Sequence, residues 1–167
     1  MIIFIPIIPG YLRQLAIITP YNEIVDSINS YVLESLSGIF KTYFSNDYIS
    51  KGPDQMANQE LLYLIEFLNS SRFSSIPDHE LKLKLGSVVM LLRNVDQNYG
   101  LCNSSRILIT QLAPNVIEGR IISGVHSNNK VFIPRIIITI KHEKWPFVLN
   151  RKQFPLRLSC GMTINKS

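Results

Sequence analysis

Nine basic side chains in the second half of the chain are the residues whose chemistry stands out first. They are Lys82, Lys84, Arg93, Arg106, Arg120, Arg135, Arg151, Lys152 and Arg157. Five aromatic residues lie among them, namely Tyr99, Phe132, Trp145, Phe147 and Phe154. Small β-barrels hold single-stranded nucleic acid with cations that follow the phosphates and rings on which bases stack. The competing interpretation places the rings in the core and the cations on a solvated surface.

Charge is divided unevenly along the 167 residues. Residues 1–80 hold four Lys/Arg against nine Asp/Glu, whereas residues 81–167 hold thirteen against three. A basic half favours an acidic or phosphate-bearing partner, although a merely soluble basic surface explains the charge equally well. With 46% apolar and 17% charged residues, the composition is that of a globular chain and excludes a disordered one.

Nucleotide hydrolysis has no matching motif in the sequence. A P-loop, GxxxxGK[ST], requires its glycines because backbone N–H groups must surround the phosphates. The nearest stretch is GMTINKS at 161–167, where the residue before the lysine is Asn165 instead of glycine and Lys166 comes one position early. We do not interpret it as a P-loop, and no acidic pair follows a buried apolar strand to hold Mg²⁺.

Metal and nucleophile chemistry also lack a pattern, so no catalytic or metal-binding residue is predicted. Cys102 and Cys160 lie outside any CxxC motif, which favours a reducing compartment and two small buried side chains. The three histidines fall in expected loops, where we expect them to have no partner: His79, His126 and His142. The apolar start of the chain is too short to span a bilayer.

The first half predicts a strand that leads into a helix. Residues 15–19 are apolar and end at Pro20, and residues 22–36 carry apolar side chains at spacings of three and four. Asn22 is the expected N-cap, and Gly38 is expected to end the helix. A strand followed directly by a helix is the unit of an open α/β sheet, whose ligands bind at the carboxyl end of the strand. Three further expectations are a strand at 41–49, a linker at 50–58 and a short helix at 60–68.

The second half predicts short strands without helices. Residues 81–85 alternate between leucine and lysine, Gly86 breaks the pattern, and residues 88–92 form an apolar run. The remaining expected strands are 106–112 and 116–123, which form a hairpin, 131–140, with Pro134 at an edge or bulge, and 153–159. Closely spaced short strands of this kind are typical of a small barrel.

Long stretches of the sequence resemble one helicase family. In the second half they are LKLKLGSVVMLLRNVDQNYGLCNSSR, VFIPRIIIT and RKQFPLRLSCGMTINKS. In this order they resemble the carboxyl-terminal part of the PIF-type DNA helicases, in particular the plant and transposon-borne group. Upstream, LRQLAIITPYNEIVDSINSYVLESLSG looks like the second motor domain of that family, and EFLNSSRFSSIPDHELKLKLG like the run into its inserted barrel.

The resemblance implies an α/β fragment of a RecA-like second motor domain (domain 2A, a P-loop NTPase fold) with an inserted β-barrel (domain 2B, Src-homology-3-like). The expected division is 1–79 and 143–167 for the motor domain and 80–142 for the barrel. The implied activity is that of an ATP-dependent 5′-to-3′ DNA helicase in DNA repair, recombination or telomere maintenance, in the nucleus or mitochondrion. ATP and Mg²⁺ serve the full-length family, none is expected in this chain, and the expected partner is single-stranded DNA, not a membrane.

The resemblance also assigns roles to residues at both ends of the chain. TINKS matches the start of a motif that couples the nucleotide site to single-stranded DNA, and the end of the first expected strand matches a motif near the DNA track. Five cations of the basic half complete the set of candidate DNA contacts. The full set is Thr19, Asn22, Lys82, Lys84, Arg93, Arg106, Arg135, Thr163, Asn165, Lys166 and Ser167.

The departures from the family decide what we expect of this chain. The P-loop, the acidic Mg²⁺ motif and the Gln-Gly-Gln after TINKS are missing, so we expect DNA binding without ATP hydrolysis. Ser104 stands where the family has glycine, which would strain a turn that needs positive φ, and Gly161 stands where it has alanine. The alternatives are a basic interaction module without a nucleic-acid role, a decayed transposon relic, and a full helicase acting from these residues alone.

Overall fold

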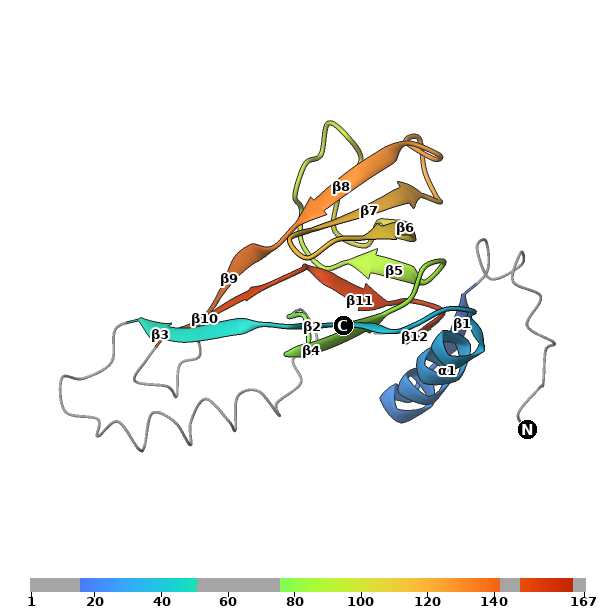
Figure 1. Cartoon of the computed structure of the whole chain (residues 1–167), viewed down its shortest axis with the longest axis horizontal. Coiled ribbons are helices and arrows are strands. Elements are labelled where there is room, and N and C mark those ends of the chain that lie inside the picture. Colours follow the sequence, from blue (N-terminus) through green and yellow to red (C-terminus); the bar gives the residue numbers. More distant parts are fainter. Residues whose placement is uncertain (1–15, 51–75, 142–147, 164–167) are drawn as a thin grey trace.

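The computed structural model describes residues 16–50, 76–141 and 148–163, which form twelve strands and one α-helix (Figure 1). This part of the chain is therefore mostly β-structure, and its one helix is too short to cross a membrane. The expected linker at 50–58, apart from Ser50, and the expected helix at 60–68 lie outside the described residues.

A parallel strand pair and one helix form the corner where the two ends of the described chain meet. Strand β1 (Ile17–Thr19) pairs in parallel with β12 (Gly161–Thr163), and helix α1 (Asn22–Ser35) packs against both. Val32 and the partly buried Ile28 of α1 pack beside strand β5 and Cys160, as their spacing predicts, whereas Ile24 near the start of the helix is exposed. The predicted cap is wrong by one residue, because extended Tyr21 is the N-cap and Asn22 already lies in the helix.

A five-stranded antiparallel sheet forms the largest part of the structure. Its order is β11 (Leu156–Leu158), β5 (Val88–Leu91), β6 (Arg106–Leu112), β7 (Val116–Ile121) and β8 (Lys130–Pro134). Alternate residues of these strands point to a common core. The hairpin predicted from residues 106–112 and 116–123 is confirmed, because β6 and β7 pair antiparallel. Strand β11 comes from the segment assigned to the motor domain, and the domain boundaries at 80 and 142 stay a prediction.

Two smaller sheets flank this one. Strand β2 (Lys41–Phe44) pairs with β4 (Glu80–Leu83), and β10 (Val148–Gln153) lies between β3 (Asn46–Ser50) and β9 (Ile136–Ile140). The β2–β4 pair is fixed to the β6–β7 turn, where Lys41 Nζ donates to Leu112 O at 3.0 Å and the Tyr43 hydroxyl donates to Ala113 O at 2.9 Å.

Three segments predicted as single strands are each divided between two sheets. The divisions fall at Ser45 (β2 to β3), Arg135 (β8 to β9) and Phe154-Pro155 (β10 to β11). At Ser45 the backbone N–H donates to His79 O outside any ladder, at 2.8 Å. Beside the other two breaks lie prolines, Pro134 and Pro155, which have no N–H for a ladder. Figure 1 shows the result, in which β3, β9 and β10 extend to one side of the five-stranded sheet.

Candidate nucleic-acid interface

The strand-end residues predicted from the two ends of the chain meet in the structure. Thr19 and Thr163 are register partners in the parallel β1–β12 pair, and Asn22 begins the helix that follows β1. Thr19 is buried, and its hydroxyl oxygen accepts a bond from the Tyr21 N–H at 3.4 Å. The TINKS motif contributes three further candidate residues, Asn165, Lys166 and Ser167, which lie outside the described residues.

Asn29 fixes this corner from the helix side. Its amide nitrogen donates to Gly161 O at 3.3 Å and to Leu158 O at 3.4 Å, while its carbonyl oxygen accepts from the Gly161 N–H at 2.8 Å. A Cβ on Gly161 would lie 3.2 Å from Ile28 Cβ, so the helix approaches β12 closely at the glycine. Sequence reasoning missed Asn29, although a polar residue at a predicted buried position of an amphipathic helix is a signal for such a contact.

Lys84 is buried and faces helix α1. Its ammonium donates to Leu36 O at 2.8 Å and to Glu34 O at 3.2 Å, and lies 4.1 Å from the centre of the Phe40 ring. A cation at the carboxyl end of a helix satisfies terminal carbonyls and complements the helix dipole. In the described conformation Lys84 therefore holds α1 against the β4–β5 turn. A contact between Lys84 and DNA stays a prediction.

Two predicted arginines also point inward. Arg135 donates to Phe44 O at 2.7 Å, and its guanidinium lies 4.9 Å from the Phe154 ring centre and 5.7 Å from that of Tyr43. Arg106 is half-buried and donates to Ser159 O at 3.4 Å, and burial lowers the pKa of its guanidinium. For both residues the described contacts are structural ones.

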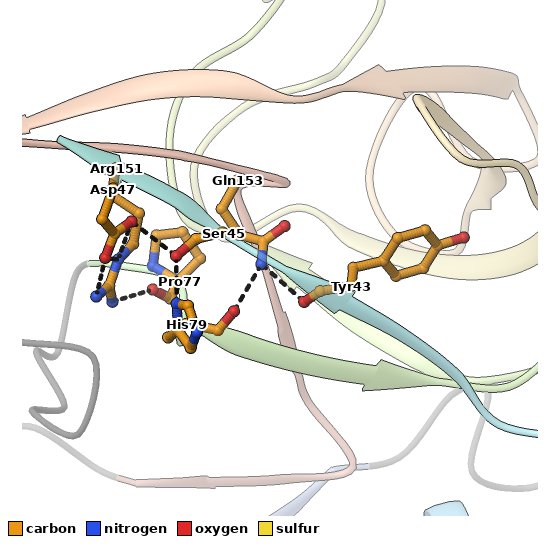
Figure 2. A network of polar contacts seen from close by, with 7 residues as sticks. All are labelled: Tyr43, Ser45, Asp47, Pro77, His79, Arg151 and Gln153. Atoms are coloured by element: carbon orange, nitrogen blue, oxygen red, sulfur yellow. Dashed lines mark hydrogen bonds and ion pairs between the residues drawn. The ribbon is translucent and has the colours of Figure 1, made fainter. Parts of the chain in front are cut away.

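A buried polar network ties the β3–β10 ladder to the segment before β4 (Figure 2). The guanidinium of Arg151 holds the Asp47 carboxylate at 2.7 Å, and these side chains are 1% and 2% exposed. Arg151 also donates to Pro77 O at 3.1 Å, and Gln153 donates to the carbonyls of Tyr43 and His79 at 3.0 and 3.1 Å. This network explains why a cation of the basic half, Arg151, is a core residue.

His79 belongs to the same network, so the expectation that it has no partner is wrong. The Ser45 hydroxyl donates to Asp47 Oδ1 at 2.7 Å and lies 2.7 Å from His79 Nδ1. Because a serine has one hydroxyl hydrogen, Nδ1 of His79 is the donor toward Ser45. Neither Ser45 nor Asp47 was predicted, because sequence does not show which residues lie beside one another across a ladder.

The exposed cations lie on several elements. Lys82 pairs with Glu80 at 3.1 Å on β4, Arg93 lies in the turn after β5, and Lys152 lies on β10. Arg120 on β7 stands opposite Lys130 on β8, a lysine that sequence reasoning did not single out. The structure therefore does not gather all predicted cations on one surface. On the β7–β8 face, two exposed cations, Arg120 and Lys130, stand opposite each other in the ladder.

The aromatic residues divide between the two interpretations. Phe154 is a core residue that contacts Tyr43 edge to face at 5.0 Å between ring centres. Phe132 and Tyr99 are exposed, and Trp145 and Phe147 lie outside the described residues. Of the two cysteines, Cys160 is buried as predicted, and burial raises the pKa of its thiol, whereas Cys102 is half-buried.

The fold that these residues build is a mostly-β domain attached to a strand–helix corner, and the comparisons connect it to a helicase. Residues 66–112 match the family model "DNA helicase Pif1, 2B domain". The matched region is therefore similar to a Pif1-type 2B domain, which confirms the coarse form of the resemblance.

Known proteins support the same assignment. The ATP-dependent DNA helicase PIF1 of Danio rerio is 32% identical over 94 residues, which make up 52% of this chain and 13% of that protein. Unliganded Pif1 from Bacteroides sp is 25% identical with a TM-score of 0.61, over 93% of this chain and 32% of that one. Bacteroides Pif1 in complex with ADP-AlF3 and ssDNA has a TM-score of 0.57 at 21% identity, over 89% and 30% of the two chains. The chain therefore spans only a minor part of each of these relatives.

Proposed function

We propose that this chain supplies single-stranded DNA binding to an ATP-dependent 5′-to-3′ DNA helicase of the PIF type. The observation that carries the proposal is the match of residues 66–112 to the Pif1 2B domain. In the part of that range that the structure describes, β4, β5 and β6 help to enclose one hydrophobic core. The Bacteroides relative that holds single-stranded DNA and a nucleotide analogue supports both the partner and the ATP dependence.

The division of labour that we propose follows the sequence. Residues 80–142 form the inserted 2B barrel, and residues 1–79 and 143–167 are pieces of a RecA-like 2A motor domain. The adjacency of Thr19 and Thr163 supports this division, because it joins the two outer segments in one parallel pair. In the longer helicase, ATP and Mg²⁺ bind outside this chain, and the segment from Thr163 to Ser167 couples them to DNA.

The cellular setting is part of the same proposal. A PIF-type helicase of the plant and transposon-borne group would act in DNA repair, recombination or telomere maintenance, in the nucleus or mitochondrion.

A binding measurement tests the proposal. The full chain is titrated against a fluorescein-labelled oligothymidylate, and fluorescence anisotropy is recorded from about 50 mM to about 200 mM salt. Three phosphate contacts would weaken single-strand binding by roughly twentyfold over this range, because log K falls by about 0.7 per contact for each decade of salt. Binding equal to that of an uncharged morpholino strand at low salt overturns the proposal.

The same experiment separates the second candidate, a basic interaction module without a nucleic-acid role. Polyglutamate of matched charge presents carboxylates but no bases. Displacement of the DNA by polyglutamate at equal charge concentration favours the basic module, because general electrostatics then suffice. DNA that resists this competitor supports a nucleic-acid site.

A further inference from the structure

The outward face of the β7–β8 pair departs from the usual pattern of a solvated sheet surface. Ile117, Gly119 and Ile121 of β7 point to the core, so Val116, Glu118 and Arg120 point outward. On the partner strand, Lys130, Phe132 and Pro134 share that outward face. The ladder places Arg120 opposite Lys130, Glu118 opposite Phe132 and Val116 opposite Pro134.

Two features of this face are unusual for a solvated sheet surface. Arg120 and Lys130 are like charges in directly opposite positions, which destabilises an antiparallel pair. Phe132 is 56% exposed, although most of the other apolar side chains of β7 and β8 are buried. Departures from such local rules are expected at functional sites.

Glu118 forms an ion pair with one of the two cations, Lys130. Its carboxylate accepts from Thr110 at 2.9 Å and forms an ion pair with Lys130 at 2.8 Å. Lys130 Nζ also lies 5.4 Å from the centre of the Phe132 ring. Because an ammonium has three donors, Lys130 can keep Glu118 and still donate to a phosphate beside the ring.

We propose that Phe132, Arg120 and Lys130 form a binding site for one nucleotide of a DNA single strand. The base stacks on the exposed ring of Phe132, and the flanking phosphates contact the two cations. An aromatic ring beside paired cations is complementary to a base attached to an anionic backbone. The inference rests on the proposed function and deepens it, because it locates a contact on β7–β8. Figure 1 shows these strands at the other end of the five-stranded sheet from β11.

The test removes the aromatic face while keeping an apolar side chain. Phe132→Leu in the full chain is titrated against oligothymidylate and against an abasic strand of the same length and charge. We expect about tenfold weaker binding of oligothymidylate, within the range of base–aromatic stacking, and no change for the abasic strand. Phe132→Trp should restore affinity, and its added fluorescence should be quenched when oligothymidylate binds.

Two matched variants control for exposure and charge. Phe44→Leu removes a ring on β2 that is 58% exposed, and Lys152→Ala removes an exposed cation on β10. We expect neither variant to change binding. Arg120→Ala and Lys130→Ala should instead weaken the binding of both oligothymidylate and the abasic strand and reduce the salt dependence of that binding.

The outcomes separate this inference from the proposed function. The stacking site is overturned if Phe132→Leu leaves the affinity for oligothymidylate unchanged, as Phe44→Leu does, or if it weakens binding of the abasic strand equally. Binding of oligothymidylate by the unmodified chain would still support the proposed function in that case. If the unmodified chain binds no strand at low salt, both are overturned.

Discussion

Thr19 and Thr163 lie side by side in a parallel strand pair, although they stand near opposite ends of the described chain. Helix α1 covers this pair, and Asn29 bonds to both the N–H and the carbonyl of Gly161. Thr19, which the resemblance places near the DNA track, and Thr163, which it places at the start of the coupling motif, therefore lie in one corner of the structure. Changes that loosen the corner should act on both segments together.

Asn29→Ala should destabilise this corner. The substitution leaves the N–H and carbonyl of Gly161 without their side-chain partner in a buried position, at a cost of about 1–3 kcal/mol in the free energy of unfolding. Urea unfolding followed by circular dichroism measures the change. Ser27→Ala is the control, because its hydroxyl bonds to Glu23 O on the exposed side of the same helix. Equal urea midpoints for the two variants would contradict the role of Asn29.

Arg151→Met should be among the most damaging substitutions in the described residues. It leaves the Asp47 carboxylate buried without its cation, and breaking such a pair costs about 3–5 kcal/mol. Thermal and urea unfolding measure the loss, with Lys152→Met, an exposed neighbour on the same strand, as the near-neutral control. Asp47→Leu combined with Arg151→Met should recover part of the stability, since no unpaired charge remains. A single variant as stable as Lys152→Met would mean that the pair contributes little.

Local periodicity explains which parts of the fold could be predicted from the sequence. The spacing of apolar residues locates α1, and alternation locates β6 and β7, because each pattern is set by neighbours along the chain. The points at which the chain leaves β2, β8 and β10 and enters a strand of another sheet could not be predicted. There the backbone changes partner while the composition stays apolar, and only distant contacts decide the change.

The same limit applies to the candidate site. Alternation in residues 81–85 correctly predicts that Leu81 and Leu83 are buried and Lys82 exposed. It fails at Lys84, because β4 ends at Leu83 and the chain turns through Gly86 at a φ of 82°. A lysine beyond the strand is then free to reach the end of α1. The pairing of Arg120 with Lys130 depends likewise on the register of β7 and β8, which the sequence does not show.

Ser104→Gly should stabilise the chain. Ser104 has a φ of 68°, which confirms that a side chain stands where the turn needs positive φ. The left-handed conformation costs a non-glycine residue about 1–2 kcal/mol, part of which glycine loses again through the entropy of the unfolded chain. We expect a net gain of about 0.5–1 kcal/mol, measured by thermal unfolding. Asn128→Gly, at a φ of 70°, should gain less because asparagine tolerates this region. A lower melting temperature for Ser104→Gly would contradict the strain.

Glu118 should make the stability of the β7–β8 face depend on pH. The hydrogen bond from Lys130, followed by that from Thr110, lowers the pKa of this carboxyl below its ordinary value of 4.5. The unfolded chain then binds more protons than the folded one between the folded-state pKa and 4.5, so stability rises with pH in that window.

The stabilisation by Glu118 is fully present above the unfolded-state pKa and is lost as the pH falls through the folded-state pKa. Glu118→Gln still accepts from Thr110 but cannot titrate, so its melting temperature should lie below that of the unmodified chain near neutral pH. The two melting temperatures should converge as the solution is acidified through the folded-state pKa of Glu118, which lies below the ordinary value of 4.5. Added salt should shrink the difference at neutral pH, because this pair lies at the surface. A difference that stays constant from neutral to acidic pH would show that the carboxylate charge contributes nothing to holding Lys130 beside Phe132.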